Sequence, residues 1–105
     1  MTARIDMPVN ARRGEIIDIN TLVAHNMETG FRRTHLGAPI PRDIITTFVC
    51  TYNGVEVFRA ELHPSVAANP YLQFSTIATE SGTLEFKWSG DNGFTATERA
   101  RITVA

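Results

Sequence analysis

The sequence has almost no cysteine, because Cys50 is the only one among its 105 residues. A single thiol cannot close a disulfide within the chain, so the bridged sandwich of antibody domains is excluded. Long apolar runs are also missing, and no stretch approaches the roughly 18 residues that a membrane-spanning helix needs. We therefore expect neither a disulfide-stapled domain nor a membrane protein.

The sequence also lacks an excess of charge of one sign. Ten basic and eleven acidic residues give a formal net charge of −1, and the pairs Arg12-Arg13 and Arg32-Arg33 form no stripe that could follow a phosphate backbone. We expect no nucleic-acid partner. The start of the sequence lacks a basic segment followed by an apolar one, so we expect no secretory signal there. On these grounds alone the chain is a soluble cytoplasmic protein or the mature part of an exported one.

The strand signals that are present run through the whole chain. Its length and its 43% hydrophobic content predict one globular domain over residues 1–105. Asn53-Gly54 lies between two alternating apolar segments and predicts a type I′ hairpin turn, in which both central residues need positive φ. Leu84, Phe86 and Trp88 alternate with polar residues in the clearest strand pattern of the chain.

About seven short strands separated by turn signals predict an all-β fold, an immunoglobulin-like antiparallel β-sandwich. A small barrel is the alternative. We expect a turn at residues 10–14, a long loop at 25–42 and one helical turn at 63–70, where Pro70 would stop the helix. The edge strands of such a sandwich can pair with another chain.

Metal-binding spacing is absent. The possible ligands are His25, His35, His63 and Cys50, and the next histidine after Cys50 is thirteen residues away. A blue-copper site needs its cysteine, second histidine and methionine close together on one loop, and a structural zinc site needs paired ligands at short spacing. We therefore expect no metal and no cofactor.

A catalytic set is absent as well. Cys50 shares a predicted strand face with Phe48 and Tyr52, so we expect a buried, inert thiol with a raised pKa. The serines have no recognisable histidine and acid partners, the carboxylates form no pair, and the isolated glycines form no phosphate-binding loop. The sequence therefore predicts a binding module without catalytic residues.

Apolar residues stand in the otherwise polar loop at 25–42. Met27, Phe31 and Leu36 either fold back to cap the sandwich or form a partner surface beside the arginines, since Met, Phe and Arg are enriched in interface cores. The predicted partner-binding residues are His25, Met27, Phe31, Arg32, Arg33, Arg42, His63 and Tyr71.

Several ordered segments resemble the SoxZ family of sulfur-oxidation carrier subunits. They are His25-x-Met27-Glu28-Thr29-Gly30, Arg32-Arg33, Ile40-Pro41-Arg42, Thr51-Tyr52-Asn53-Gly54, Leu62-His63-Pro64, Ala68-Asn69-Pro70-Tyr71, Ser81-Gly82-Thr83-Leu84 and Ile102-Thr103-Val104. The resemblance covers nearly the whole chain, with Asn26 as a small departure where a proline is expected.

The resemblance implies an immunoglobulin-like subunit that forms a heterodimer with SoxY, whose cysteine lies in a glycine-rich C-terminal arm and carries sulfur intermediates. It also implies transient contact with other Sox enzymes and a periplasmic location, reached by export with a signal-bearing partner. This sequence ends in a strand pattern without such an arm or cysteine, so it does not resemble the carrier subunit.

Two alternatives remain open at this point. One is a small metal-dependent redox protein on an immunoglobulin-like fold, such as a superoxide-reductase-like iron protein, although that site needs four histidines and the chain has three. The other is an adhesion or assembly domain that works by strand pairing.

Overall fold

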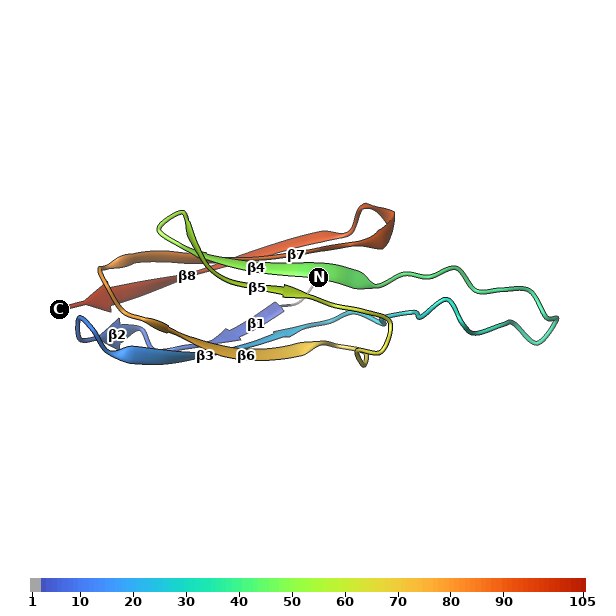
Figure 1. Cartoon of the computed structure of the whole chain (residues 1–105), viewed down its shortest axis with the longest axis horizontal. Helices are drawn as coiled ribbons and strands as arrows, with labels where there is room; N and C mark the ends of the chain where they lie inside the picture. The colour runs from blue at the N-terminus through green and yellow to red at the C-terminus, as the bar shows by residue number, and fades with distance from the viewer. Residues whose placement is uncertain (1–2) are drawn as a thin grey trace.

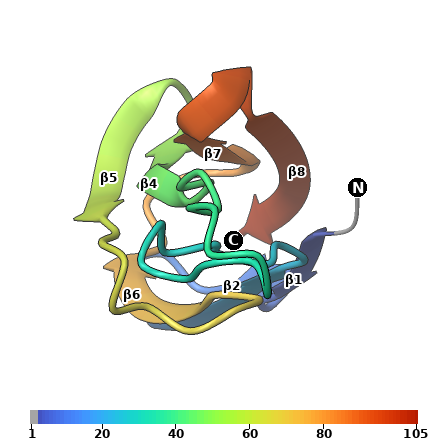
Figure 2. The ribbon, with the colours of Figure 1, turned by 90° about the vertical axis from the view of Figure 1, so that its right-hand side faces the viewer.

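The computed structural model describes residues 3–105 and confirms the predicted all-β sandwich. One sheet has three strands in the order β1 (Ala3–Asp6), β3 (Ile16–Val23) and β6 (Tyr71–Ile77). The other has five, in the order β2 (Asn10–Ala11), β8 (Thr95–Val104), β7 (Gly82–Gly90), β4 (Ile45–Tyr52) and β5 (Val55–Glu61). The sheets form the two layers of the sandwich, seen from the side in Figure 1 and along the long axis in Figure 2.

Strict alternation of apolar and polar residues builds the core between the sheets. Successive side chains of a strand point to opposite faces, so the apolar set of each strand meets the other sheet. Phe48 lies at the centre, within 6.4 Å of the ring centres of Phe58, Phe74, Phe86 and Trp88. Full burial of each large side chain contributes about 1.5–3 kcal/mol relative to exposure. The fully buried positions include the predicted series Leu84, Phe86 and Trp88.

The predicted Asn53-Gly54 hairpin is confirmed. Both residues have positive φ, at 48° and 84°, and they join β4 to β5. Nearby, the hydroxyl of Tyr52 accepts hydrogen bonds from the backbone N–H groups of Thr79 and Glu80, each at 3.3 Å, and donates to the Glu80 carbonyl. This end of the sandwich is therefore closed by a buried polar contact.

One local prediction is incomplete and another is wrong. Residues 10–14 are not only a turn, because Asn10 and Ala11 pair in parallel with Thr103 and Val104 as the short strand β2. Residues 63–70 contain no helix: the Val66 N–H donates to the His63 carbonyl over 2.9 Å, a single turn. Asn69 then takes positive φ and hydrogen-bonds with His25 instead of continuing a helix.

The predicted loop between β3 and β4 is a long two-stranded arm, which we call the arm and define as residues 28–43. Figure 1 shows it projecting beyond the sandwich along the long axis. The molecule measures 60 × 20 × 19 Å as a result. No helix among residues 3–105 is long and apolar enough to cross a membrane.

Candidate partner surface

The outer end of the arm is a tight turn from Thr34 to Ala38. The backbone N–H of Thr34 donates to the Ala38 carbonyl over 2.8 Å, and the Gly37 N–H donates to the Thr34 carbonyl over 2.9 Å. Gly37 has φ of 85°, a conformation that suits glycine. The Arg33 guanidinium donates to the Gly37 carbonyl over 3.0 Å. The turn therefore holds residues 35 and 36 outward.

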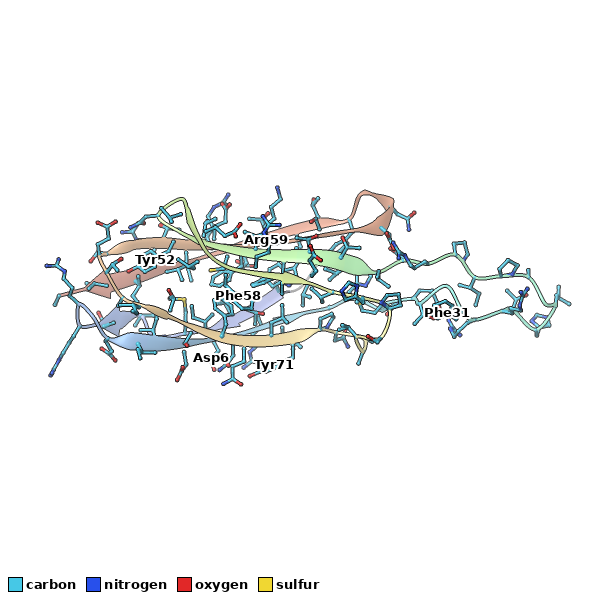
Figure 3. The ribbon with its side chains drawn as sticks, in the orientation of Figure 1. Asp6, Phe31, Tyr52, Phe58, Arg59 and Tyr71 are labelled. Atoms are coloured by element: carbon cyan, nitrogen blue, oxygen red, sulfur yellow. The ribbon has the colours of Figure 1, made fainter. Side chains whose placement is uncertain are left out.

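Large apolar side chains on the arm are almost wholly exposed. Phe31 is 82% exposed and Leu36 is 83% exposed, and Figure 3 shows Phe31 well outside the sandwich. Between residues 29 and 41 there is no Asp or Glu, while Arg32, Arg33 and His35 lie in this stretch. Arg32 pairs with Glu28, so the outer part of the arm, residues 29–41, presents its apolar side chains beside Arg33, a composition found in protein interfaces.

The base of the arm is fixed by a bidentate ion pair. Asp91, in the 3-10 turn Asp91–Gly93, accepts hydrogen bonds from Arg42 Nε at 2.9 Å and from a terminal guanidinium nitrogen at 3.0 Å. The same carboxylate accepts the backbone N–H of Ile44 at 3.1 Å. The Arg42 hydrogen bonds and this N–H lower the pKa of Asp91.

The two legs of the arm touch at Gly30. A Cβ at this position would lie 2.9 Å from Cβ of Arg42, and φ of Gly30 is 86°. Only glycine permits this approach. Closer to the sandwich, Glu28 and Asp43 exchange two backbone hydrogen bonds of 2.8 Å. The Glu28 carboxylate also forms an ion pair with Arg32. The base of the arm is therefore ordered even though the tip has no contact with the core.

His25 and Met27 lie under the arm rather than on its surface. Met27 is 4% exposed, and its sulfur accepts the Ile45 N–H at 3.3 Å. Nδ1 of His25 accepts the Met27 N–H at 2.9 Å, and the imidazole packs edge-on against Phe94. The Asn69 side chain accepts the His25 N–H at 2.9 Å. These contacts join the arm to the 62–70 segment.

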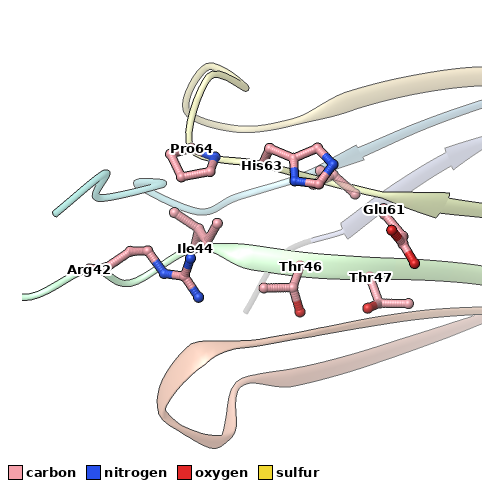
Figure 4. A pocket seen from close by; sticks show the side chains of 8 residues that line it. Arg42, Ile44, Thr46, Thr47, Glu61, His63 and Pro64 are labelled. Carbon is pink, nitrogen blue, oxygen red and sulfur yellow. The ribbon is translucent and has the colours of Figure 1, made fainter. Parts of the chain in front are cut away.

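A hollow of about 270 Å³ opens beside the base of the arm (Figure 4). Arg42 and Ile44 line one wall, His63 and Pro64 the opposite wall, and Thr46, Thr47, Glu61 and Leu62 complete the lining. Arg42 and Glu61 bring opposite charges, so the hollow has no strong preference for anions or cations.

The structure separates the eight predicted interface residues into four groups. Phe31, Arg32, Arg33 and Arg42 lie on the exposed arm, and His63 lies at the hollow. Tyr71 is 59% exposed on the outer face of the three-stranded sheet. His25 and Met27 are largely covered, because they pack at the arm base. Of the apolar loop residues, Met27 caps the sandwich, whereas Phe31 and Leu36 do not. The role of these residues in binding stays a prediction.

Sequence reasoning missed Asp91 and Asn69, which position the arm from distant parts of the chain. Asp91 begins the sequence Asp-Asn-Gly, which indicates only a turn, and Asn69 directly precedes Pro70. An Asp before Asn-Gly is common in turns, so the local sequence carries no signal for its bond to Arg42, 49 positions away.

The Asp91–Arg42 contact predicts acid loosening of the arm base. A carboxylate with a lowered pKa stabilises the fold at pH values above its ordinary value of 3.8, and this contribution is lost as the pH falls through the lowered pKa. We expect the Ile44 amide in NMR spectra to shift, and its protection factor against hydrogen exchange to fall, below pH 3.8. Asp91→Asn should show the faster exchange already at neutral pH, whereas Asp18→Asn should behave as wild type. Equal exchange in Asp91→Asn and wild type would refute the contact.

Cys50 is buried, as predicted, and its pKa is raised to about 12 by burial. At pH 8 the thiolate fraction is then on the order of 10⁻⁴, so the thiol is unreactive. We expect no reaction of the native protein with Ellman's reagent at pH 8, and one thiol per chain after unfolding in guanidinium. Rapid labelling of the native protein would contradict this expectation.

The comparisons with solved structures identify the fold. Superoxide reductase (neelaredoxin) from Ignicoccus hospitalis is 16% identical, with a TM-score of 0.76 over 100% of this chain and 81% of that one. The sulfur carrier protein SoxY from Chlorobium limicola is 10% identical, with a TM-score of 0.68 over 98% and 78%. Both likenesses concern the fold alone. In the described residues, no three His, Cys, Asp or Glu side chains are grouped as metal ligands would be.

The comparison with family models identifies more than the fold. The model described as sulphur oxidation protein SoxZ matches residues 5–101. No curated protein matches the sequence directly.

Proposed function

Because the chain belongs to the SoxZ family of sulfur-oxidation proteins, we propose that it is the non-catalytic subunit of a two-chain sulfur carrier. Its partner is a SoxY-like subunit, which holds sulfur intermediates on a cysteine in a C-terminal arm. This chain binds that subunit and presents it to the enzymes of thiosulfate oxidation. The match to the family over residues 5–101 is the observation that carries the proposal.

The chemistry of the chain agrees with a presenting role. Its single thiol is buried with a raised pKa, so it offers no nucleophile of its own for sulfur transfer. A packed sandwich supplies a rigid body, and an arm anchored at its base supplies a recognition element at a fixed place. The subunit therefore contributes geometry, and the partner contributes the reactive cysteine.

Within this proposal, the arm is the element that the Sox enzymes contact transiently. Its exposed Phe31 and Leu36 supply apolar contacts, and Arg32 and Arg33 attract acidic surfaces. The pair works in the periplasm, and this chain is exported together with a signal-bearing partner. Fractionation of the native host tests this location: recovery of the chain in the cytoplasmic fraction alone would contradict it.

The test of the proposed function is mild affinity purification of the chain from its native host, followed by intact-mass analysis. We expect a stoichiometric second protein with a cysteine in a glycine-rich C-terminal arm, and a mass increase on that protein from bound sulfur. Elution of the chain alone, as a stable monomer at micromolar concentration, would refute the two-chain carrier.

Alanine at both Arg32 and Arg33 should weaken enzyme docking without unfolding the domain. Both side chains are exposed, and their removal leaves the core intact. Exposed interface charges mainly change the association rate and its salt dependence, so we expect several-fold slower thiosulfate turnover at low ionic strength and a smaller difference at high salt. Unchanged turnover at low salt would exclude this role for the pair.

A further inference from the structure

The outer face of the three-stranded sheet differs from every other face of the sandwich. The strand register places its outward residues in rows: Arg4, Leu22 and Tyr71 form the first row, and Asp6, Asn20 and Gln73 form the second. Further along, Asp18 lies opposite Ser75 and Ile16 opposite Ile77. We call these residues the small-sheet face. Figure 3 shows Asp6 and Tyr71 pointing away from the five-stranded sheet.

The small-sheet face carries apolar side chains that no residue between 3 and 105 covers. Ile16 is 68% exposed, Tyr71 59%, Ile77 53% and Leu22 38%. Leu22 and Tyr71 are direct cross-strand neighbours, so they form one contiguous patch next to Arg4. Tyrosine and arginine around an apolar centre are typical of interface hot spots. Scattered single apolar residues would carry no such meaning.

Polar groups on the same face lack partners. The Oδ1 atom of Asn20 is covered from solvent and accepts no hydrogen bond. In the described part of the chain, Arg4, Asp6 and Asp18 take part in no ion pair. Arg4, Asp6 and Asp18 are exposed, so they are free to form ion pairs with a second chain.

The outer face of the five-stranded sheet shows the opposite arrangement. Glu85 pairs with Arg99 at 2.8 Å, and Glu56 pairs with Arg59 at 2.9 Å. Arg101 donates to the Thr83 hydroxyl at 3.3 Å. Most charges on that face are therefore satisfied within the chain, as expected of a surface that stays in water. The small-sheet face instead combines exposed apolar groups with charges that have no ion-pair partner among residues 3–105.

We infer that the small-sheet face is where the SoxY-like carrier subunit packs, with the row Arg4, Leu22 and Tyr71 at the centre of the contact. This inference rests on the proposed function. The SoxY carrier of Chlorobium limicola has the same sandwich fold, so a partner of this kind also offers a sheet face, and two sheet faces pack well at a spacing of about 10 Å. A complementary partner face carries a carboxylate opposite Arg4 and a cation opposite Asp6.

The size of the face shows that the contact extends beyond it. Three strands of up to eight residues cover roughly 370 Å², by the usual strand spacing and rise. A stable interface buries about 800 Å² on each partner. A shallow depression lined by Ala3, Ala24 and Asn69 continues the face toward the arm base. The partner therefore also covers this depression, which leaves the arm tip and the five-stranded face free for the transient enzyme contacts.

The test measures binding of the SoxY-like chain from the same host by titration calorimetry. Leu22→Arg places a charge in the patch, and Tyr71→Ala removes its most exposed ring. We expect each to weaken binding at least tenfold. The matched control is Thr95→Arg, which introduces the same side chain at a similar height on the outer face of the five-stranded sheet and should bind within twofold of wild type.

Each outcome of this test has a distinct meaning. Circular dichroism melting must first show that the variants are folded. If Leu22→Arg is unstable, the test uses Tyr71→Ala, which removes only an exposed ring. Wild-type binding with no loss in Tyr71→Ala would overturn the small-sheet face while the proposed function stands. Absence of wild-type binding would refute the proposed function itself. A third outcome is that the wild type self-associates and that Leu22→Arg makes it monomeric without changing carrier binding. This outcome would identify a second copy of the chain as the occupant of the face and overturn the inference.

Discussion

Gly90→Ala is expected to lower the free energy of unfolding by about 2–3 kcal/mol, and the melting temperature by roughly 10–20 °C. A Cβ at Gly90 would lie 2.3 Å from the Ile44 carbonyl oxygen and 2.8 Å from Cα of Ile45. Both neighbours are backbone atoms of the adjoining strand, so no side chain can rotate away. The added methyl group must push β4 and β7 apart.

The constraint at Gly90 is steric rather than conformational. Its φ of −167° is extended backbone that any residue adopts. Gly14→Ala is a matched control, because Gly14 has φ of 87° but no atom within 4 Å of the added Cβ. We expect that variant to lose only about 1 kcal/mol. The melting of both variants is monitored by circular dichroism. If Gly90→Ala melts within 2 °C of wild type, β4 and β7 are packed less closely at this position than the structure indicates.

Displacement at Gly90 should also disturb the arm. The next residue, Asp91, holds Arg42 and accepts the Ile44 amide, and its own N–H donates to the Ile44 carbonyl over 2.9 Å. A shift of the Ile44 backbone therefore moves the contacts that fix the arm base. In a folded Gly90→Ala sample at low temperature, we expect the amide resonances of residues 42–45 to shift more than those of β8.

Shortening the arm is expected to abolish enzyme docking while leaving the sandwich folded. Gly30 lies beside Arg42, and Pro41 has no N–H with which to close a two-residue turn. Replacing residues 31–40 with the flexible linker Gly-Ser-Gly-Ser removes the outer part of the arm and keeps the contact of Gly30 with Arg42. The core contains no residue between 28 and 43, so the melting temperature should stay within about 3 °C of wild type.

The functional loss in the shortened variant should be large. It removes Phe31 and Leu36, and anchors of this type are each worth about 1–3 kcal/mol in protein interfaces. We expect thiosulfate turnover by the reconstituted enzymes to fall at least tenfold, with carrier binding unchanged. Val55→Ser, at the exposed opposite end of the molecule, is the control and should have no effect. Full turnover by the shortened variant would exclude the arm as a docking element.

Local patterns predicted the sandwich because its strands follow local rules. The Asn53-Gly54 turn and the alternation of Leu84, Phe86 and Trp88 depend only on neighbouring residues. The burial of Cys50 followed from the same alternation. Such positions carry their structural meaning within a few residues.

The features that the sequence did not predict depend on distant contacts. The two residues of β2 pair with the far end of the chain, and no short window contains both partners. The arm has little apolar alternation, since glycine and proline interrupt it, so it resembled an ordinary loop. The small-sheet face was hidden for another reason: Tyr71 was singled out, but only the register shows that it adjoins Leu22 and Arg4.

The pairing of β2 with β8 has a consequence for the order of folding. It joins residues near opposite ends of the sequence. Similarly, β3 pairs with β6, which comes after the whole β4–β5 hairpin in the sequence. Contacts between distant residues must overcome a large loop-closure entropy before they contribute stability, so refolding is slow compared with a helical domain of equal size. The Asn53-Gly54 hairpin is the part that can form early. Until β6 follows and pairs with β3, the apolar side of that hairpin is uncovered, so a nascent chain stalled before β6 would be a target for chaperones and proteases.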